Sequence, residues 1–193
     1  MLTGWARPSG RRVLAVLGVF VGLFVVSSIG ATAFWSSTGG VGILDIDGGA
    51  NLFQPDTARP FPPKGTGLRV LAILASYDAT ARLAHVVMTC TLDLLLPLSI
   101  AALCWVGVVW AGGRTRWVRV AAGTLALAYL LADWGENSLE LYLLAGGRGA
   151  AVDVLPVASQ LKVVLFALVG AAIIIGVVTR WLRRRTGLTI VET

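Results

Sequence analysis

Ionisable residues lie within two stretches that are otherwise apolar enough to form membrane helices. In the first, His85, Thr89 and Asp93 recur every four residues, so that a helix places them on one face. In the second, the polar residues follow the i, i+3, i+4, i+7 spacing of one helical face; they are Asp133, Glu136, Asn137 and Glu140. Neighbouring carboxyls in a buried site can act as general acid and general base. Asp93, Asp133 and Glu136 are therefore the candidate catalytic residues.

Cations that could neutralise these carboxyls lie at the edges of the same stretches. Lys162 lies near the start of a third apolar stretch, and Arg82 precedes the first. An ionised side chain that faces lipid costs at least about 2.5–3.5 kcal/mol, so we expect the charged groups to face one another. Acids outnumber cations in this group, and we therefore expect one carboxyl to hold a proton. Apart from the three carboxyls above, the predicted ion-pair or binding network is Tyr77, Arg82, His85, Asn137, Glu140, Gln160 and Lys162.

The composition predicts the helices that position these residues. Of the 193 residues 56% are apolar and 13% are charged, and the mean hydropathy is +0.81. A soluble domain has about a quarter of its residues charged, so an ordinary soluble enzyme is excluded. Four apolar runs have the roughly 20 residues that cross a bilayer: 13–35, 86–110, 120–144 and 157–179. The sequence predicts an all-α protein, a four-helix bundle that is integral to a membrane and forms one domain over residues 1–193.

Positive charge is concentrated on one side of the four predicted spans. That side holds both termini and the loop between the second and third spans, and it carries ten arginines but one acid, Glu192. The positive-inside rule places this side, and so both termini, in the cytoplasm. Topology and attraction to anionic membrane lipid explain the net charge of +6 without a nucleic-acid partner. We expect a multi-pass protein of the plasma (inner) membrane.

The first span admits a second interpretation. It ends at Ala31-Thr32-Ala33, which resembles the small-residue cleavage site of a secretory signal. The apolar run is longer than the apolar core of a typical signal, so we favour an uncleaved helix. Gly18 and Gly22 have the small-xxx-small spacing of helix interfaces. We favour tight packing within the chain there over a homodimer or a partner membrane protein.

The outer segment 36–85, between the first two spans, is too long for a simple turn. Asp45, Asp47 and Asp56 have the spacing of an EF-hand, but Ala50 occupies the position where that loop needs Gly. We therefore predict a solvated turn there. Apolar residues at helical spacing then predict a short helix, about 67–76, on the outer membrane surface; they are Leu68, Leu71, Ala72, Leu74 and Ala75. Asp78 is positioned to cap the helix that follows.

The cysteines and the histidine add no metal or cofactor site. Cys90 and Cys104 are fourteen residues apart on one predicted helix, about 21 Å, which no disulfide spans. The single histidine cannot build a multi-histidine metal centre. We expect neither a metal nor a cofactor.

Several of the singled-out residues occur in the order of a known group of proteins. Tyr77 and Arg82 are followed by Leu92-Asp93 and Pro97, then by Asp133-Trp134-Gly135-Glu136-Asn137, and then by Lys162. This order resembles small, uncharacterised four-span bacterial membrane proteins with an Asp/Pro helix, an Asp-x-x-Glu-Asn helix and a Lys in the last span. The resemblance covers roughly residues 68–170. It implies the same site residues and supplies no chemistry.

Three functions from different classes fit this organisation. We favour a structural ion-pair network in an accessory subunit, because polar groups inside membranes often join helices. The cluster could instead perform acid–base chemistry on a lipid or isoprenoid, with a protonated carboxyl as the acid. It could also carry protons or a small solute, although charge thins out in the inner half of every span and no internal repeat relates the two halves. A cavity beside Asp93 and Glu136 would favour the enzyme.

Overall fold

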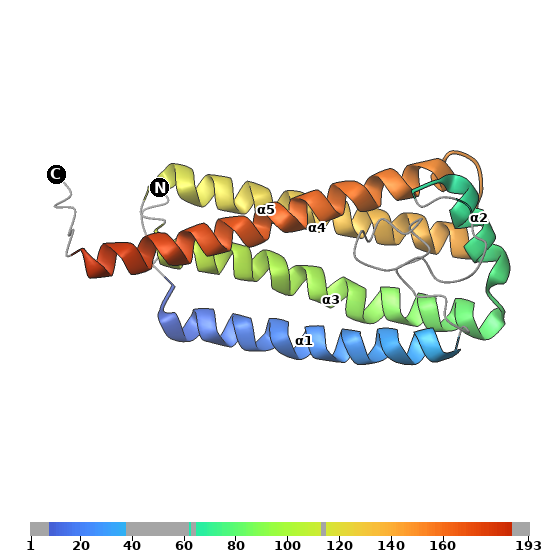
Figure 1. The fold of residues 1–193 in the computed structure, drawn as a ribbon, viewed down its shortest axis with the longest axis horizontal. Helices are drawn as coiled ribbons and strands as arrows, with labels where there is room; N and C mark the ends of the chain where they lie inside the picture. The colour runs from blue at the N-terminus through green and yellow to red at the C-terminus, as the bar shows by residue number, and fades with distance from the viewer. Residues whose placement is uncertain (1–7, 38–61, 63–64, 113–114, 187–193) are drawn as a thin grey trace, which may run out of the picture.

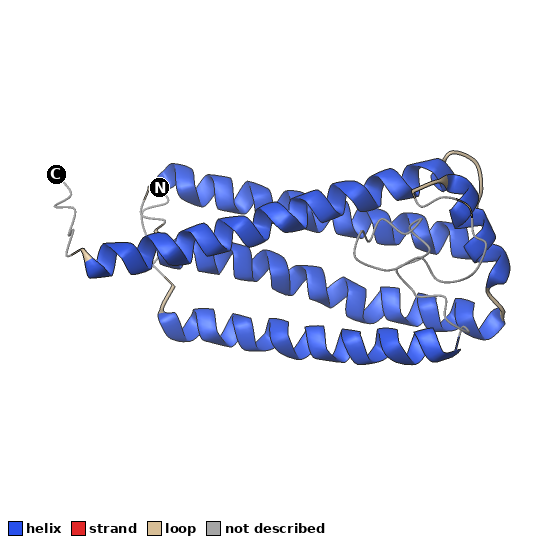
Figure 2. Cartoon of the chain, viewed as in Figure 1, coloured by secondary structure: helices blue, strands red, loops and turns tan. Residues whose placement is uncertain are grey.

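Helices make up all of the regular structure that the computed structural model describes, over residues 8–37, 62, 65–112 and 115–186. These residues form five helices and no strand, and the all-α prediction is confirmed. Figure 2 shows helices joined by loops. The helices are α1 (Gly10–Ser37), α2 (Gly67–Ser76), α3 (Ala79–Ala111), α4 (Arg116–Leu144) and α5 (Ala151–Arg185). The turn expected around Asp45, Asp47 and Asp56 lies outside the described residues.

The four long helices run alternately in opposite directions beside one another (Figure 1). α1 packs on α3, α3 packs on α4 and α5, and α4 packs on α5. The starts of α1 and α4 and the ends of α3 and α5 therefore lie at one end of the molecule. We call it the arginine end, because its described arginines are Arg11, Arg12, Arg116, Arg119, Arg180, Arg183 and Arg185. The opposite end carries α2 and is called the capped end.

Three of the helices are long and apolar enough to cross a membrane. They include the segments Gly10–Ala33 of α1, Ala79–Ala111 of α3 and Ala151–Arg183 of α5. α4 has 29 residues, which is also long enough at 1.5 Å per residue. Its mean hydropathy is lower because one of its faces carries Asp133, Glu136, Asn137 and Glu140. Length and composition thus give three of the four expected spans.

α1 presents apolar side chains around much of its circumference. Leu14, Val19, Phe24 and Ile29 are each more than half exposed. The helix packs mainly on α3, where a Cβ added to Gly30 would lie 3.2 Å from Cε of Met88. A helix that is apolar on its exposed sides is suited to lipid.

The two glycines of α1 that match a helix-interface motif make no helix contact. Gly18 and Gly22 are exposed, and a Cβ added to either would meet no atom within 4 Å. Within the described part of the chain, the tight intramolecular packing that we favoured for them is therefore absent.

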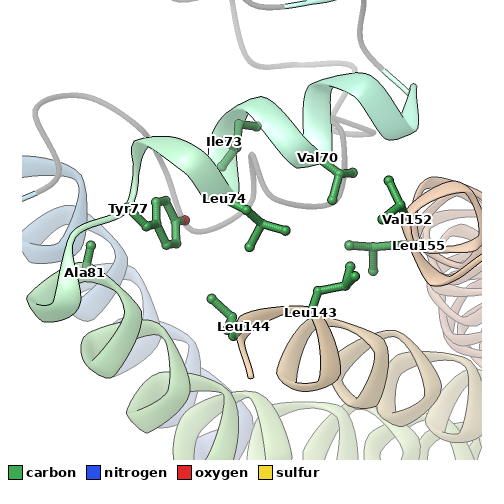
Figure 3. Close-up of a cluster of buried hydrophobic side chains, with 9 residues drawn as sticks. All are labelled: Val70, Ile73, Leu74, Tyr77, Ala81, Leu143, Leu144, Val152 and Leu155. Carbon is green, nitrogen blue, oxygen red and sulfur yellow. The ribbon is translucent and has the colours of Figure 1, made fainter. Parts of the chain in front are cut away.

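α2 lies across the capped end of the bundle and buries one face there (Figure 3). Leu74 points from α2 toward the last turn of α4, where Leu143 is fully buried, and Ile73 is fully buried in the same cluster. Leu155, from the start of α5, closes the side of this cluster and has no exposed surface. The buried members of this cap core are Val70, Ile73, Leu74, Tyr77, Ala81, Leu143, Leu144, Val152 and Leu155.

The buried face of α2 differs from the apolar stripe expected to lie on the membrane. Only Leu74 of that stripe is buried; Ala72 is half-buried, and Leu68, Leu71 and Ala75 are exposed. The helix is apolar on two sides, and its other apolar side completes the cap core with residues of α4 and α5. Those partners lie more than 60 residues further along the chain, so the pattern of α2 alone does not show which side they cover.

Side-chain caps fix where α2 and α3 begin. Thr66 Oγ1 accepts a hydrogen bond from the Arg69 backbone N–H at 3.3 Å at the start of α2. Asp78 Oδ1 accepts one from the Ala81 N–H at 2.7 Å at the start of α3. The predicted cap at Asp78 is confirmed, and it satisfies a donor that a helix N-terminus otherwise leaves free.

A second apolar core joins α3, α4 and α5 between the polar residues and the arginine end. Its buried members are Ile100, Ala101, Cys104, Ala126, Tyr129 and Val169. Cys104 is buried there, Cys90 is exposed on the same helix, and both are free thiols. The prediction that these two cysteines form no disulfide is confirmed.

Candidate functional site

The polar residues of α3, α4 and α5 meet in the half of the bundle nearer the capped end. Because α3 and α4 are antiparallel, His85 lies opposite Glu140 and Asp93 lies opposite Asn137. Lys162 reaches the same region from α5. We call this group the polar layer; its residues are His85, Thr89, Asp93, Asp133, Glu136, Asn137, Glu140 and Lys162.

A histidine links three segments at the top of the polar layer. His85 Nε2 lies 3.3 Å from Glu140 Oε2, and His85 Nδ1 lies 3.4 Å from the Tyr77 hydroxyl. All three side chains are buried, and the rings of Tyr77 and His85 are 5.9 Å apart. The contacts connect the segment after α2 to α3 and then to α4. Tyr77 thereby joins the polar layer to the cap core.

Lys162 pairs with two carboxyls of α4. Its ammonium forms an ion pair with Glu136 Oε2 and lies 3.9 Å from Asp133 Oδ1. Glu136 is 1% exposed, so its charge has almost no access to solvent. A buried carboxylate without a partner is strongly destabilising, and Lys162 supplies that partner from another helix.

Asn137 satisfies a backbone carbonyl that a proline leaves free. In an α-helix the carbonyl of one residue accepts from the N–H four residues later. The fourth residue after Asp93 is Pro97, which lies within α3 and has no N–H. Asn137 Nδ2 donates to the Asp93 carbonyl oxygen at 3.1 Å and to Asp133 Oδ2 at 3.3 Å. The amide thus joins α4 to α3 where the hydrogen-bond ladder of α3 is interrupted.

Asn137→Leu is expected to lower the free energy of unfolding by about 1–2 kcal/mol, because the Asp93 carbonyl then lacks its donor. Pro97→Ala restores an N–H at residue 97, so the same Leu substitution is expected to cost less in that background. A double-mutant cycle, followed by unfolding in detergent micelles, measures the difference. Equal costs in both backgrounds would show that Asn137 acts through Asp133 and not through the freed carbonyl.

Among the described residues, Arg82 forms no ion pair with the carboxyls beside which we expected it. Its guanidinium donates to the carbonyl oxygens of Leu74 at 2.8 Å and Leu144 at 3.1 Å. These carbonyls belong to the last turns of α2 and α4, where helical N–H donors run out; the Leu74 carbonyl accepts only a long bond of 3.4 Å from the Tyr77 N–H besides. A charged donor at a helix C-terminus is stabilising, so Arg82 fastens two helix ends together.

Two further residues differ from their expected places. Gln160 is exposed, and its amide lies beside Gly65 rather than in the polar layer. Tyr129, which the expected network omitted, is buried one helical turn from Asp133 on α4, with its ring 6.1 Å from that of Phe166. Its position in the sequence, four residues before Asp133 and so on the same helical face, could have indicated that Tyr129 lies beside the polar layer.

One hollow on the described surface lies away from the polar layer. It has a volume of about 420 Å³ and is lined by Ser28, Ile29, Thr32 and Ala33, all on α1. None of the candidate site residues lines it. Among the described residues, no group of three or more His, Cys, Asp or Glu side chains is placed to hold a metal ion.

The polar layer contains more negative than positive groups. Lys162 and His85 face four carboxyls, which are Asp93, Asp133, Glu136 and Glu140. Even with both cations charged, two carboxyls are left to be neutralised by other means. The layer is therefore suited to cross-linking helices and to holding protons or small cations.

No family model, curated protein or solved structure matches this chain. The geometry of the polar layer is the basis on which a function is proposed.

Proposed function

We propose that the polar layer is structural, and that it holds α4 between α3 and α5 in a multi-pass membrane protein that serves as an accessory or interaction subunit. The observation that carries this proposal is that its contacts cross between helices. Glu136 with Lys162 joins α4 to α5, while Glu140 with His85 joins α4 to α3. Lipid provides no hydrophobic force between helices, so polar contacts of this kind supply part of the association.

In this proposal α4 also spans the membrane, which makes four spans together with α1, α3 and α5. Its acidic residues Asp133, Glu136 and Glu140 are buried against neighbouring helices, whereas Leu127 and Leu131 are exposed on another side. A helix that turns its charges into the bundle and its leucines outward can face lipid. The burial of these acids therefore supports a spanning role that mean hydropathy alone does not support.

We place both termini in the cytoplasm, with the protein in the plasma (inner) membrane. The arginine end holds the start of α1 and the end of α5, and its described residues include no acid. Asp78 and Asp153 lie at the capped end, at the starts of α3 and α5. This asymmetry supports a cytoplasmic arginine end under the positive-inside rule.

The resemblance to four-span bacterial membrane proteins fits the same proposal. The residues that carry it include Glu136, Asn137 and Lys162, which make the contacts of α4 with its neighbours. We propose that such proteins share a way of holding a polar helix in the bundle, with membrane lipid as the surrounding partner.

A charge exchange between α4 and α5 tests the structural role. Glu136→Lys alone and Lys162→Glu alone place like charges together, and each is expected to leave little folded protein in the membrane. The two substitutions together restore an opposite pair and are expected to recover most of the folded protein. Folded yield after detergent extraction and complementation of a deletion strain are the two measurements. A double variant that folds but fails to complement would contradict a purely structural role and favour acid–base chemistry at Glu136.

A further inference from the structure

Thr89 is a buried hydroxyl whose contacts within the polar layer are incomplete. It is 2% exposed, and its Oγ1 has no hydrogen-bond partner among the described residues. On α3 it lies one turn from His85, which contacts Glu140, and one turn from Asp93, whose carbonyl contacts Asn137. A residue midway between two such contacts faces the same neighbouring helix. Thr89 therefore faces α4 at the level of Glu136 and Asn137.

Two carboxyls at this level have oxygens that the described residues do not satisfy. Glu136 Oε2 meets Lys162, but Glu136 Oε1 is buried and has no hydrogen-bond partner there. The Asp93 carboxyl forms no ion pair or hydrogen bond with another residue in the described ranges, although its backbone carbonyl is bound by Asn137. A buried polar atom without a partner costs about 1–3 kcal/mol. The buried oxygens Thr89 Oγ1 and Glu136 Oε1 therefore indicate, together with the half-buried Asp93 carboxyl, a site that binds a ligand.

The charge and the donor atoms of the site indicate which kind of ligand it binds. A hydroxyl and carboxylate oxygens are hard ligands that favour hard cations. Lys162 pairs with Glu136 and lies 3.9 Å from Asp133, whereas Asp93, one turn from Thr89, forms no ion pair among the described residues. Of the two carboxyls left without a cation, Asp93 is thus the one that places about one negative charge beside Thr89. One charge is matched by a monovalent cation.

We propose that Thr89 Oγ1, Glu136 Oε1 and the Asp93 carboxyl form a buried site for a monovalent cation, with Na⁺ as the probe. The site goes beyond the structural role, because the cation completes the polar layer where protein cross-links leave oxygens unsatisfied. A proton would also neutralise Asp93, but it would not need the Thr89 hydroxyl. Dependence on both the cation and this hydroxyl therefore distinguishes the two.

The test is thermal unfolding of the full chain in detergent, in NaCl or in choline chloride at equal ionic strength. Na⁺ is expected to raise the Tm of the wild-type protein by about 3–6 °C, because a ligand that binds the folded state stabilises it. Thr89→Val is expected to abolish the rise, and Thr89→Ser to retain it. Thr91→Val is the matched control, since Thr91 is exposed and its hydroxyl donates to the Val87 carbonyl at 2.6 Å.

Equal Tm values in NaCl, KCl and choline chloride would overturn the proposal, as would a Thr89→Val variant that keeps the full rise. If Thr89→Val yields no folded protein, the cation site is tested instead by equilibrium binding of radioactive Na⁺ to the wild-type and Asp93→Asn proteins. About one ion per wild-type chain and a loss of binding in Asp93→Asn support the site; no binding to the wild type overturns it. The charge exchange at Glu136 and Lys162 tests the structural role separately, so either proposal can be contradicted without the other.

Discussion

Lys162→Met is expected to lower the free energy of unfolding by about 3–5 kcal/mol. Methionine keeps a long unbranched side chain but removes the charge that neutralises Glu136, which is 1% exposed. Removal of one partner of a buried ion pair leaves an uncompensated charge, and that charge accounts for the cost. Reversible unfolding in mixed micelles, followed by circular dichroism as the fraction of denaturing detergent rises, measures the change.

Two further variants separate the ion pair from other effects of Lys162. Gln160→Met, at an exposed position two residues earlier on α5, is expected to change stability by no more than about 0.5 kcal/mol. Lys162→Met combined with Glu136→Leu removes both charges and is expected to recover most of the lost stability, because apolar residues often replace a buried ion pair without cost. The ion pair is not the source of the effect if this double variant is as unstable as Lys162→Met.

Helical spacing was sufficient to predict which polar residues share a face. The repeat from His85 to Asp93 on α3 faces the acids of α4, as the contact between His85 and Glu140 shows. The high cost of charge in lipid further indicated that Lys162 would lie beside these acids, and the structure pairs it with Glu136. Periodicity and charge are properties of the residues themselves, so they can be evaluated without knowing the fold.

Contacts with the backbone could not be predicted in the same way. Arg82 binds carbonyls of Leu74 and Leu144, and the second of these lies 62 residues away in the chain. Every helix end offers free carbonyls, so a residue pattern cannot show which of them a particular arginine reaches. The bond from Asn137 to the Asp93 carbonyl did leave a signal, because Pro97 follows Asp93 by four residues and removes its usual donor.

The position of α2 depends on which of its two apolar sides is covered. Its helical spacing was visible in the sequence, but both sides are apolar. The exposed side carries Leu68, Leu71 and Ala75 of the stripe that we expected on the membrane surface. The structure places the other side on Leu143 and Leu155. The choice is made by residues of α4 and α5, which is why it requires the tertiary structure.

Ile73→Ala is accordingly expected to destabilise the capped end by about 2–5 kcal/mol, because Ile73 is fully buried in the cap core and its truncation leaves a cavity. The loss is expected to appear first as detachment of α2, measured as faster amide hydrogen exchange over residues 67–76 than in the wild type. Leu68→Ala is the matched control, since Leu68 lies on the same helix and is 68% exposed. Its effect is expected to stay within about 0.5 kcal/mol. Equal exchange in the two variants would mean that the exposed stripe on the membrane, and not the cap core, holds α2 in place.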